Sequence, residues 1–151
     1  MKLAEALILR ADTMKRIQQL RERLTRSAQI PEGERPPEDP QELLAEVDRM
    51  LAQYTDIVSR INRTNSLTPF QEGKMVTDAL AERDTLSLER SLLESLMTAA
   101  TNQSYRYQRA EIKYVSTVSV AAVQKRMDDL ARRYRELDSA IQALNWQIDL
   151  I

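Results

Sequence analysis

Apolar residues recur every three or four positions along most of this chain, the spacing of one face of an α-helix. The clearest run fills the last third of the sequence and continues without a miss. It consists of Val120, Val123, Met127, Leu130, Tyr134, Leu137, Ile141, Leu144, Ile148 and Ile151. We therefore predict a long helix over about 119–151.

Three further helices are predicted, over about residues 2–28, 40–64 and 76–100. The second has the most regular stripe of the three. That stripe comprises Leu43, Val47, Met50, Tyr54, Ile57 and Ile61. The third is noisier, because Arg83 and Asp84 lie among its apolar positions. Heptad-like stripes of this kind are typical of bundles and coiled coils, so we predict an all-α fold with four long helices in an antiparallel bundle.

Two segments rich in helix-breaking residues separate the first three helices. Residues 30–40, IPEGERPPEDP, hold four of the five prolines, and Asp39 followed by Pro40 is typical of a helix N-terminus. The second break contains Pro69 and Gly73. With 151 residues and few turn residues, we expect a single helical domain over 1–151.

The polar connection 101–118 is the longest stretch without helical period. Residues 114–120 alternate and contain β-branched side chains, which indicates a strand. A short β-hairpin is therefore possible here, with residues 103–109 pairing with 112–118.

The absence of Cys and His restricts the chemistry of the chain. It removes thiol nucleophiles, Ser-His-Asp triads and Cys/His zinc sites. Di-metal helical bundles use Glu-x-x-His motifs, which this chain cannot supply. We assign no catalytic residue, no metal ligand and no cofactor, and we expect a non-enzymatic protein.

Charge does not favour a nucleic-acid partner. The formal net charge is −1, whereas nucleic-acid binders usually have a basic surface. Tyr105 and Tyr107 do flank Arg106, a pattern that stacks on bases, but the segment is short.

The polar run INRTN at 61–65 has two interpretations. In the structural one, Asn65 ends the second helix in a left-handed conformation and Arg63 binds its last carbonyls. In the functional one, the run is a corner that binds an anionic or polar ligand. The residues proposed for such a site are Asn62, Arg63, Asn65, Arg106, Arg109 and Lys113.

The N-terminal MKLAEALILR lacks the features of a signal peptide, and no run reaches the length of a membrane span. We therefore expect a cytoplasmic protein. The chain ends in the apolar NWQIDLI. Either the start of the first helix or a second subunit covers these residues. We favour a second subunit, and hence a homo-oligomer formed through helix stripes and this terminus.

Five motifs spread over nearly the whole chain resemble a family of small bacterial proteins called septicolysin-like. These motifs are MKLAEALILRAD at the start, INRTN at 61–65, LAERD at 80–84, RAEIK at 109–113 and RELDSAIQALNW at 135–146. The resemblance implies a helical fold, and the family name implies a membrane-active cytolysin. It supplies no catalytic residues.

Three functional hypotheses follow. The leading one is a helical structural or interaction protein that self-associates. The second is a membrane-active lysin, for which LAEALILRA in the first helix is the candidate amphipathic segment. The third is an anion-binding protein with its site near Arg63.

Overall fold

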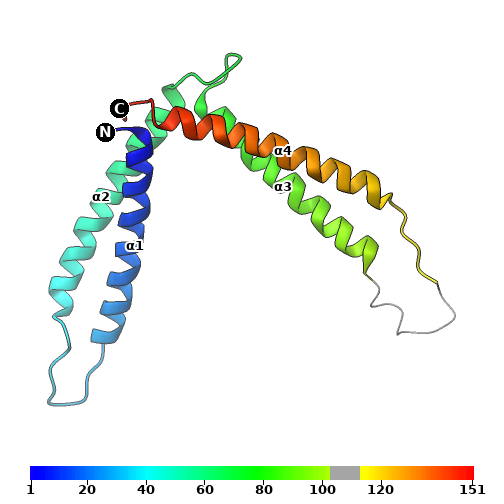
Figure 1. Cartoon of the computed structure of the whole chain (residues 1–151). Coiled ribbons are helices and arrows are strands. Elements are labelled where there is room, and N and C mark those ends of the chain that lie inside the picture. Colours follow the sequence, from blue (N-terminus) through cyan, green and yellow to red (C-terminus); the bar gives the residue numbers. More distant parts are fainter. Residues whose placement is uncertain (103–112) are drawn as a thin grey trace. The chain divides into compact units, whose positions relative to one another are not determined.

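The computed structural model describes residues 1–102 and 113–151, and these residues form four long α-helices (Figure 1). They are α1 (Leu3–Ser27), α2 (Pro40–Leu67), α3 (Val76–Thr101) and α4 (Val120–Asn145). Within this part of the chain, β-structure is limited to two isolated bridges, Lys2 with Asp149 and Pro69 with Met75. The all-α prediction is confirmed.

The helices pack as two antiparallel pairs, which belong to two compact units. The terminal unit, residues 1–68 and 143–151, contains α1 and α2. The central unit, residues 69–142, contains α3 and most of α4. The prediction that residues 1–151 form one domain stays a prediction.

Ion pairs show the direction of packing in each unit. Arg16 of α1 binds Glu46 of α2, and Arg23, further along α1, binds the earlier Glu38. In the central unit, Arg83 binds Asp138, while the later Glu89 binds the earlier Arg126. Both pairs are therefore antiparallel.

Each unit has its own apolar core. In the terminal unit, Leu3 and Ala6 of α1 meet Ile57 and Ile61 of α2. In the central unit, Leu86, Leu93 and Leu130 form the buried cluster. Partly buried side chains of the predicted α4 stripe pack around it, namely Val123, Met127, Tyr134 and Leu137. The stripes predicted for α2 and α4 thus supply the buried faces of these helices.

The buried face of α1 differs from the one that the apolar spacing of this helix predicts. The predicted face consists of Leu3, Leu7, Met14, Ile17, Leu24 and Ala28. Met14 is 38% exposed, whereas Thr13, Leu20 and Ser27 are buried. The seam repeats every seven residues, and it includes small polar side chains that a hydrophobic pattern passes over. The Thr13 hydroxyl is satisfied because it donates to the Leu9 carbonyl at 2.8 Å.

Helix α2 begins as predicted and ends later than predicted. The Asp39 side chain accepts a hydrogen bond from the Gln41 N–H at 2.8 Å, and Pro40 is the first helical residue. The helix continues through Asn65 to Leu67, so the predicted end at residue 64 and the left-handed Asn65 were both wrong. Pro69 explains the true end, because a residue before proline avoids the helical region and Thr68 is extended.

Residues 69–75 form a tight turn that leads into α3. Glu72 and Gly73 have φ of 54° and 77°, and the Lys74 N–H donates to the Gln71 carbonyl at 2.9 Å. Two consecutive residues with positive φ are typical of a type I′ turn. The turn ends where α3 begins at Val76, as predicted.

Helix α4 ends at Asn145, so the predicted helix to residue 151 was wrong over its last six residues. Beyond it the chain turns and becomes extended, and the Leu3 N–H donates to the Ile148 carbonyl at 3.0 Å. Pairing with the start of the chain therefore replaces the last helical turns.

The predicted β-hairpin lies mainly on residues 103–112, outside the described residues. Residues 113–119, which the structure does describe, contain no strand.

Candidate functional site

Three residues of the predicted polar corner lie near the end of α2. Asn62 and Arg63 are exposed and Asn65 is half-buried. Asn62 and Asn65 are three residues apart and share one side of the helix, whereas the neighbouring Arg63 points elsewhere. Lys113 is exposed in the connection before α4, and Arg106 and Arg109 lie outside the described residues. Ligand binding by these six residues stays a prediction.

Thr64 is the buried member of the INRTN run, with no exposed surface. Its hydroxyl donates to the Arg60 carbonyl at 2.9 Å and accepts from the Ile151 N–H at 3.0 Å. The Arg60 side chain donates to the Ile151 carbonyl at 3.2 Å. This end of α2 therefore holds the last residue of the chain.

A second set of contacts joins the two chain termini to each other. The Lys2 ammonium lies 2.9 Å from an Asp149 carboxylate oxygen and donates to the Gln147 carbonyl at 3.0 Å. The Leu150 N–H donates to the Met1 carbonyl at 2.9 Å. The Lys2 contact lowers the pKa of Asp149 from its ordinary value. Together with Thr64, these bonds form a structural clasp. Thr64 of the polar run therefore has a structural role, which differs from the one predicted for Asn65.

The apolar C-terminal residues are covered in part by their own chain. Ile148 and Leu150 pack on the α1–α2 core, so the start of α1 does cover them. Trp146 and Ile151 remain 57% and 52% exposed. Coverage of the remaining apolar surface of this terminus by a second subunit stays a prediction.

A charged hollow of about 330 Å³ lies between the end of α1 and the start of α2. Its lining includes Arg23, Glu38, Glu42, Glu46 and Arg49. Since arginines and carboxylates are mixed along its wall, the hollow presents neither a cationic nor an anionic surface to a ligand.

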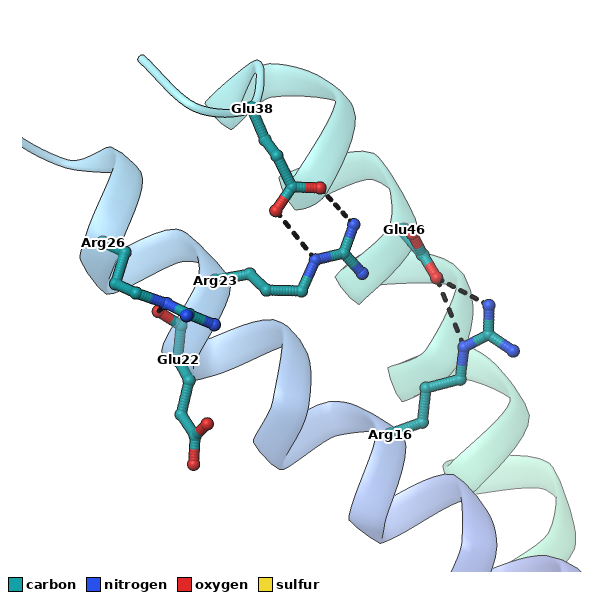
Figure 2. Close-up of polar contacts among 6 residues, drawn as sticks. All are labelled: Arg16, Glu22, Arg23, Arg26, Glu38 and Glu46. Atoms are coloured by element: carbon teal, nitrogen blue, oxygen red, sulfur yellow. Dashed lines mark hydrogen bonds and ion pairs between the residues drawn. The ribbon is translucent and has the colours of Figure 1, made fainter.

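Two ion pairs connect the helices at this hollow. Figure 2 shows the Arg23 guanidinium directed at Glu38 through two nitrogens, with Nε 2.9 Å from Oε2. Arg16 also uses two nitrogens, but both donate to the same Glu46 oxygen, Oε1, at 2.8 and 3.3 Å. The hydrogen bonds from Arg23 lower the pKa of Glu38, so this carboxylate is ionised and already engaged at neutral pH. A carboxylate in that state is a poor general base.

The described residues contain no group of three or more acids, histidines or cysteines placed to hold a metal ion. The paired charges at the hollow fit a structural role that sets the register of α1 on α2.

A third feature is an exposed stripe on α3, hereafter the outer stripe. Leu88, Leu92 and Leu96 follow one another every four residues and are 65%, 65% and 38% exposed. Small uncharged residues extend the same side of the helix in both directions. These are Ala81, Thr85 and Ala99, all exposed.

Comparison with known proteins gives a family for the chain. Residues 10–150 match the model of a family of unknown function, DUF6847. The chain belongs to this family.

A solved structure resembles this DUF6847 member over its whole length. It is the crystal structure of a functionally unknown conserved protein from Corynebacterium diphtheriae, with 43% sequence identity and a TM-score of 0.93. The alignment covers 100% of this chain and 99% of that one. No curated protein matches the chain. The septicolysin-like resemblance, and the membrane activity that it implies, stay predictions.

In the described part of this DUF6847 protein, the helices are too polar or too short in their apolar runs to cross a membrane. The cytoplasmic location stays a prediction.

Sequence reasoning missed two of these features in the DUF6847 protein. The clasp depends on Lys2 and Asp149, which are far apart in the sequence and carry no local signal. The outer stripe is visible in the sequence only as irregular apolar spacing, because α3 carries a buried stripe and an exposed stripe on neighbouring faces.

Replacing Glu38 with Gln should lower the melting temperature at pH 7 and make it less dependent on pH. The pKa of Glu38 is lowered in the folded chain, so its stabilisation is present above the ordinary value of about 4.3 and is lost as pH falls through the lowered value. Thermal unfolding followed by circular dichroism between about pH 7 and 2 tests this.

Asp48→Asn is the matched control, since Asp48 is exposed on α2 and has no ion pair among the described residues. The wild type and Glu38→Gln should converge at the acid end. A constant gap between them at every pH would show that the ion pair is not the cause.

Proposed function

We propose that this DUF6847 protein is a non-enzymatic helical protein that self-associates, and that the outer stripe of α3 is the surface that associates. The observation that carries the proposal is the continuity of the stripe. From Ala81 to Ala99 it contains no charged residue, and at 1.5 Å per residue it is about 27 Å long.

Single exposed leucines are common on soluble proteins and need no explanation. Three leucines on consecutive turns of one helix face, extended by alanine and threonine, form a contiguous apolar patch instead. Such patches mark interaction sites more often than scattered residues do. The outward side of α4 contrasts with it, since exposed positions there include Lys125, Arg126, Asp128 and Arg132.

The acids that border the outer stripe are already paired within the chain. Glu82 lies 2.9 Å from the Lys74 ammonium. Glu89 accepts from Arg126 Nε at 3.0 Å, and Asp84 lies 3.4 Å from Arg83. A partner therefore meets an apolar surface whose edges need no further counter-charge.

Light scattering after size-exclusion chromatography tests this proposal with two variants. The wild type should have twice the chain mass of 17.4 kDa at high concentration. Leu92→Glu should have the mass of one chain, because it places a charge in the middle of the stripe. Its circular dichroism spectrum should be unchanged, because Leu92 is 65% exposed.

Leu51→Glu is the control, since Leu51 is 45% exposed and lies on α2, in the terminal unit. It should associate as the wild type does. A dimeric Leu92→Glu, or a wild type that never exceeds the mass of one chain, would refute the proposal.

A further inference from the structure

We infer that the partner of the outer stripe is a second copy of the same chain, whose α3 lies antiparallel to the first with Leu92 of each copy near the two-fold axis. This inference rests on the proposed function and adds the geometry of the complex.

The architecture of the central unit leaves room for such a partner. Among the described residues, α4 packs on the side of α3 where Leu86 and Leu93 are buried. Residues 114–118 line a shallow hollow with Leu96 and Ala99 at the far end of the stripe. Leu92 directly precedes Leu93, and successive residues are about 100° apart around a helix with 3.6 residues per turn. The outer stripe is thus a separate face. Helical domains normally have a second packed layer, and a second antiparallel pair would complete a four-helix arrangement.

The charge on the outer stripe favours an identical copy as the occupant. Symmetric pairing brings each surface against itself, so any uncompensated charge would meet a like charge. The stripe carries no charge, and the acids on its borders are bound to Lys74, Arg83 and Arg126 of the same chain. The uncharged stripe itself therefore meets its own copy without repulsion.

The distribution of charge along α3 favours the antiparallel orientation. The acids Asp78, Glu82, Asp84 and Glu89 all precede Leu92, whereas Glu94 is the one charged residue of α3 that follows it. In a parallel pair, Glu82 and Glu89 of one chain would lie beside the same two residues of the other chain. Antiparallel pairing places the charged half of one helix against the nearly uncharged half of the other, and it also opposes the helix dipoles.

Side-chain size along the stripe agrees with a centre at Leu92. In that register, Leu88 of one copy faces Leu96 of the other, and Thr85 faces Ala99. Large residues therefore meet at the middle, and small residues meet at the ends. A contact about 27 Å long between helices about 10 Å wide covers about 270 Å² on each copy, which is less than a stable interface buries and typical of a weak, transient one. We therefore expect a dissociation constant no tighter than about micromolar.

Disulfide cross-linking tests this geometry cleanly because the chain has no cysteine of its own. Under mild oxidation, Leu92→Cys should form a covalent dimer at least about tenfold faster than the off-stripe control Leu51→Cys. The reason is that an interface raises the effective concentration of two facing thiols to about the millimolar range.

A mixture of Leu88→Cys and Leu96→Cys, one of them carrying a mass tag, tests the orientation. The antiparallel register predicts the mixed disulfide. It also predicts slow self-linking of each variant alone, since two copies of residue 88 lie about 12 Å apart along the axis, beyond disulfide reach. Rapid self-linking of Leu88→Cys would overturn the antiparallel arrangement.

Light scattering of the same samples before oxidation separates the two possible failures. A wild-type dimer whose Leu92→Cys variant does not cross-link faster than Leu51→Cys would refute this geometry and leave self-association intact. A single-chain mass with no preferential cross-linking would refute self-association itself.

Discussion

Replacing Ile61 with Ala should lower the free energy of unfolding by about 2–5 kcal/mol, the usual cost of a large-to-small change in a closed core. Ile61 is 2% exposed and packs with Leu3, Ala6 and Ile57, which come from both α1 and α2. The change removes three carbons at a point where the two helices and the clasp residues Ile148 and Leu150 meet.

Urea unfolding followed by circular dichroism measures this loss. Leu51→Ala is the matched control, because it is on the same helix and 45% exposed. It should cost less than about 1 kcal/mol, as is usual for surface substitutions. Equal losses for Ile61→Ala and Leu51→Ala would mean that the α1–α2 core is not where the structure places it.

Replacing Leu130 with Ala should destabilise the central unit by a similar amount, about 2–5 kcal/mol. Leu130 is 3% exposed and is the buried residue that α4 contributes to the cluster with Leu86 and Leu93. Because these contacts lie within one chain, the loss should be the same at every protein concentration.

Leu92→Ala is the informative comparison for that variant. Leu92 is on the exposed side of α3, so its truncation should act through association alone. Its effect on the melting temperature should then depend on protein concentration, because binding stabilises the folded state by mass action. A loss for Leu92→Ala that is as large as that for Leu130→Ala and independent of concentration would place Leu92 in the core.

Local patterns in the sequence predicted the helices because each helix buries one face against a neighbour. The α4 stripe from Val123 to Ile141 and the α2 stripe from Leu43 to Ile61 both supply core residues. Asp39 and Pro40 mark the start of α2, because capping by the Asp side chain and the fixed φ of Pro depend only on neighbouring residues.

Predictions were wrong where tertiary contacts override local periodicity. The apolar spacing of Ile148 fits a helix, yet its carbonyl bonds Leu3 and its side chain packs on α1 and α2. Nothing near residue 148 in the sequence carries that information. The end of α2 does follow from a local signal. Pro69 makes Thr68 extended and ends the helix there, whereas Asn65 does not end it.

The candidate site was harder to predict than the fold. Thr64 holds Ile151, although the hypothesis emphasised its neighbours Asn62 and Arg63. Polarity alone does not distinguish a side chain that ties down the backbone from one that binds a ligand. Only the partner of each hydroxyl or guanidinium makes that distinction.

Sedimentation equilibrium of the unmodified protein tests most directly whether the outer stripe is covered by a second chain. The predicted result is a mass of twice 17.4 kDa at about 100 µM, falling toward 17.4 kDa on dilution below the expected micromolar dissociation constant. A mass of 17.4 kDa at every concentration up to about 1 mM would contradict self-association, because even a weak specific dimer is populated there.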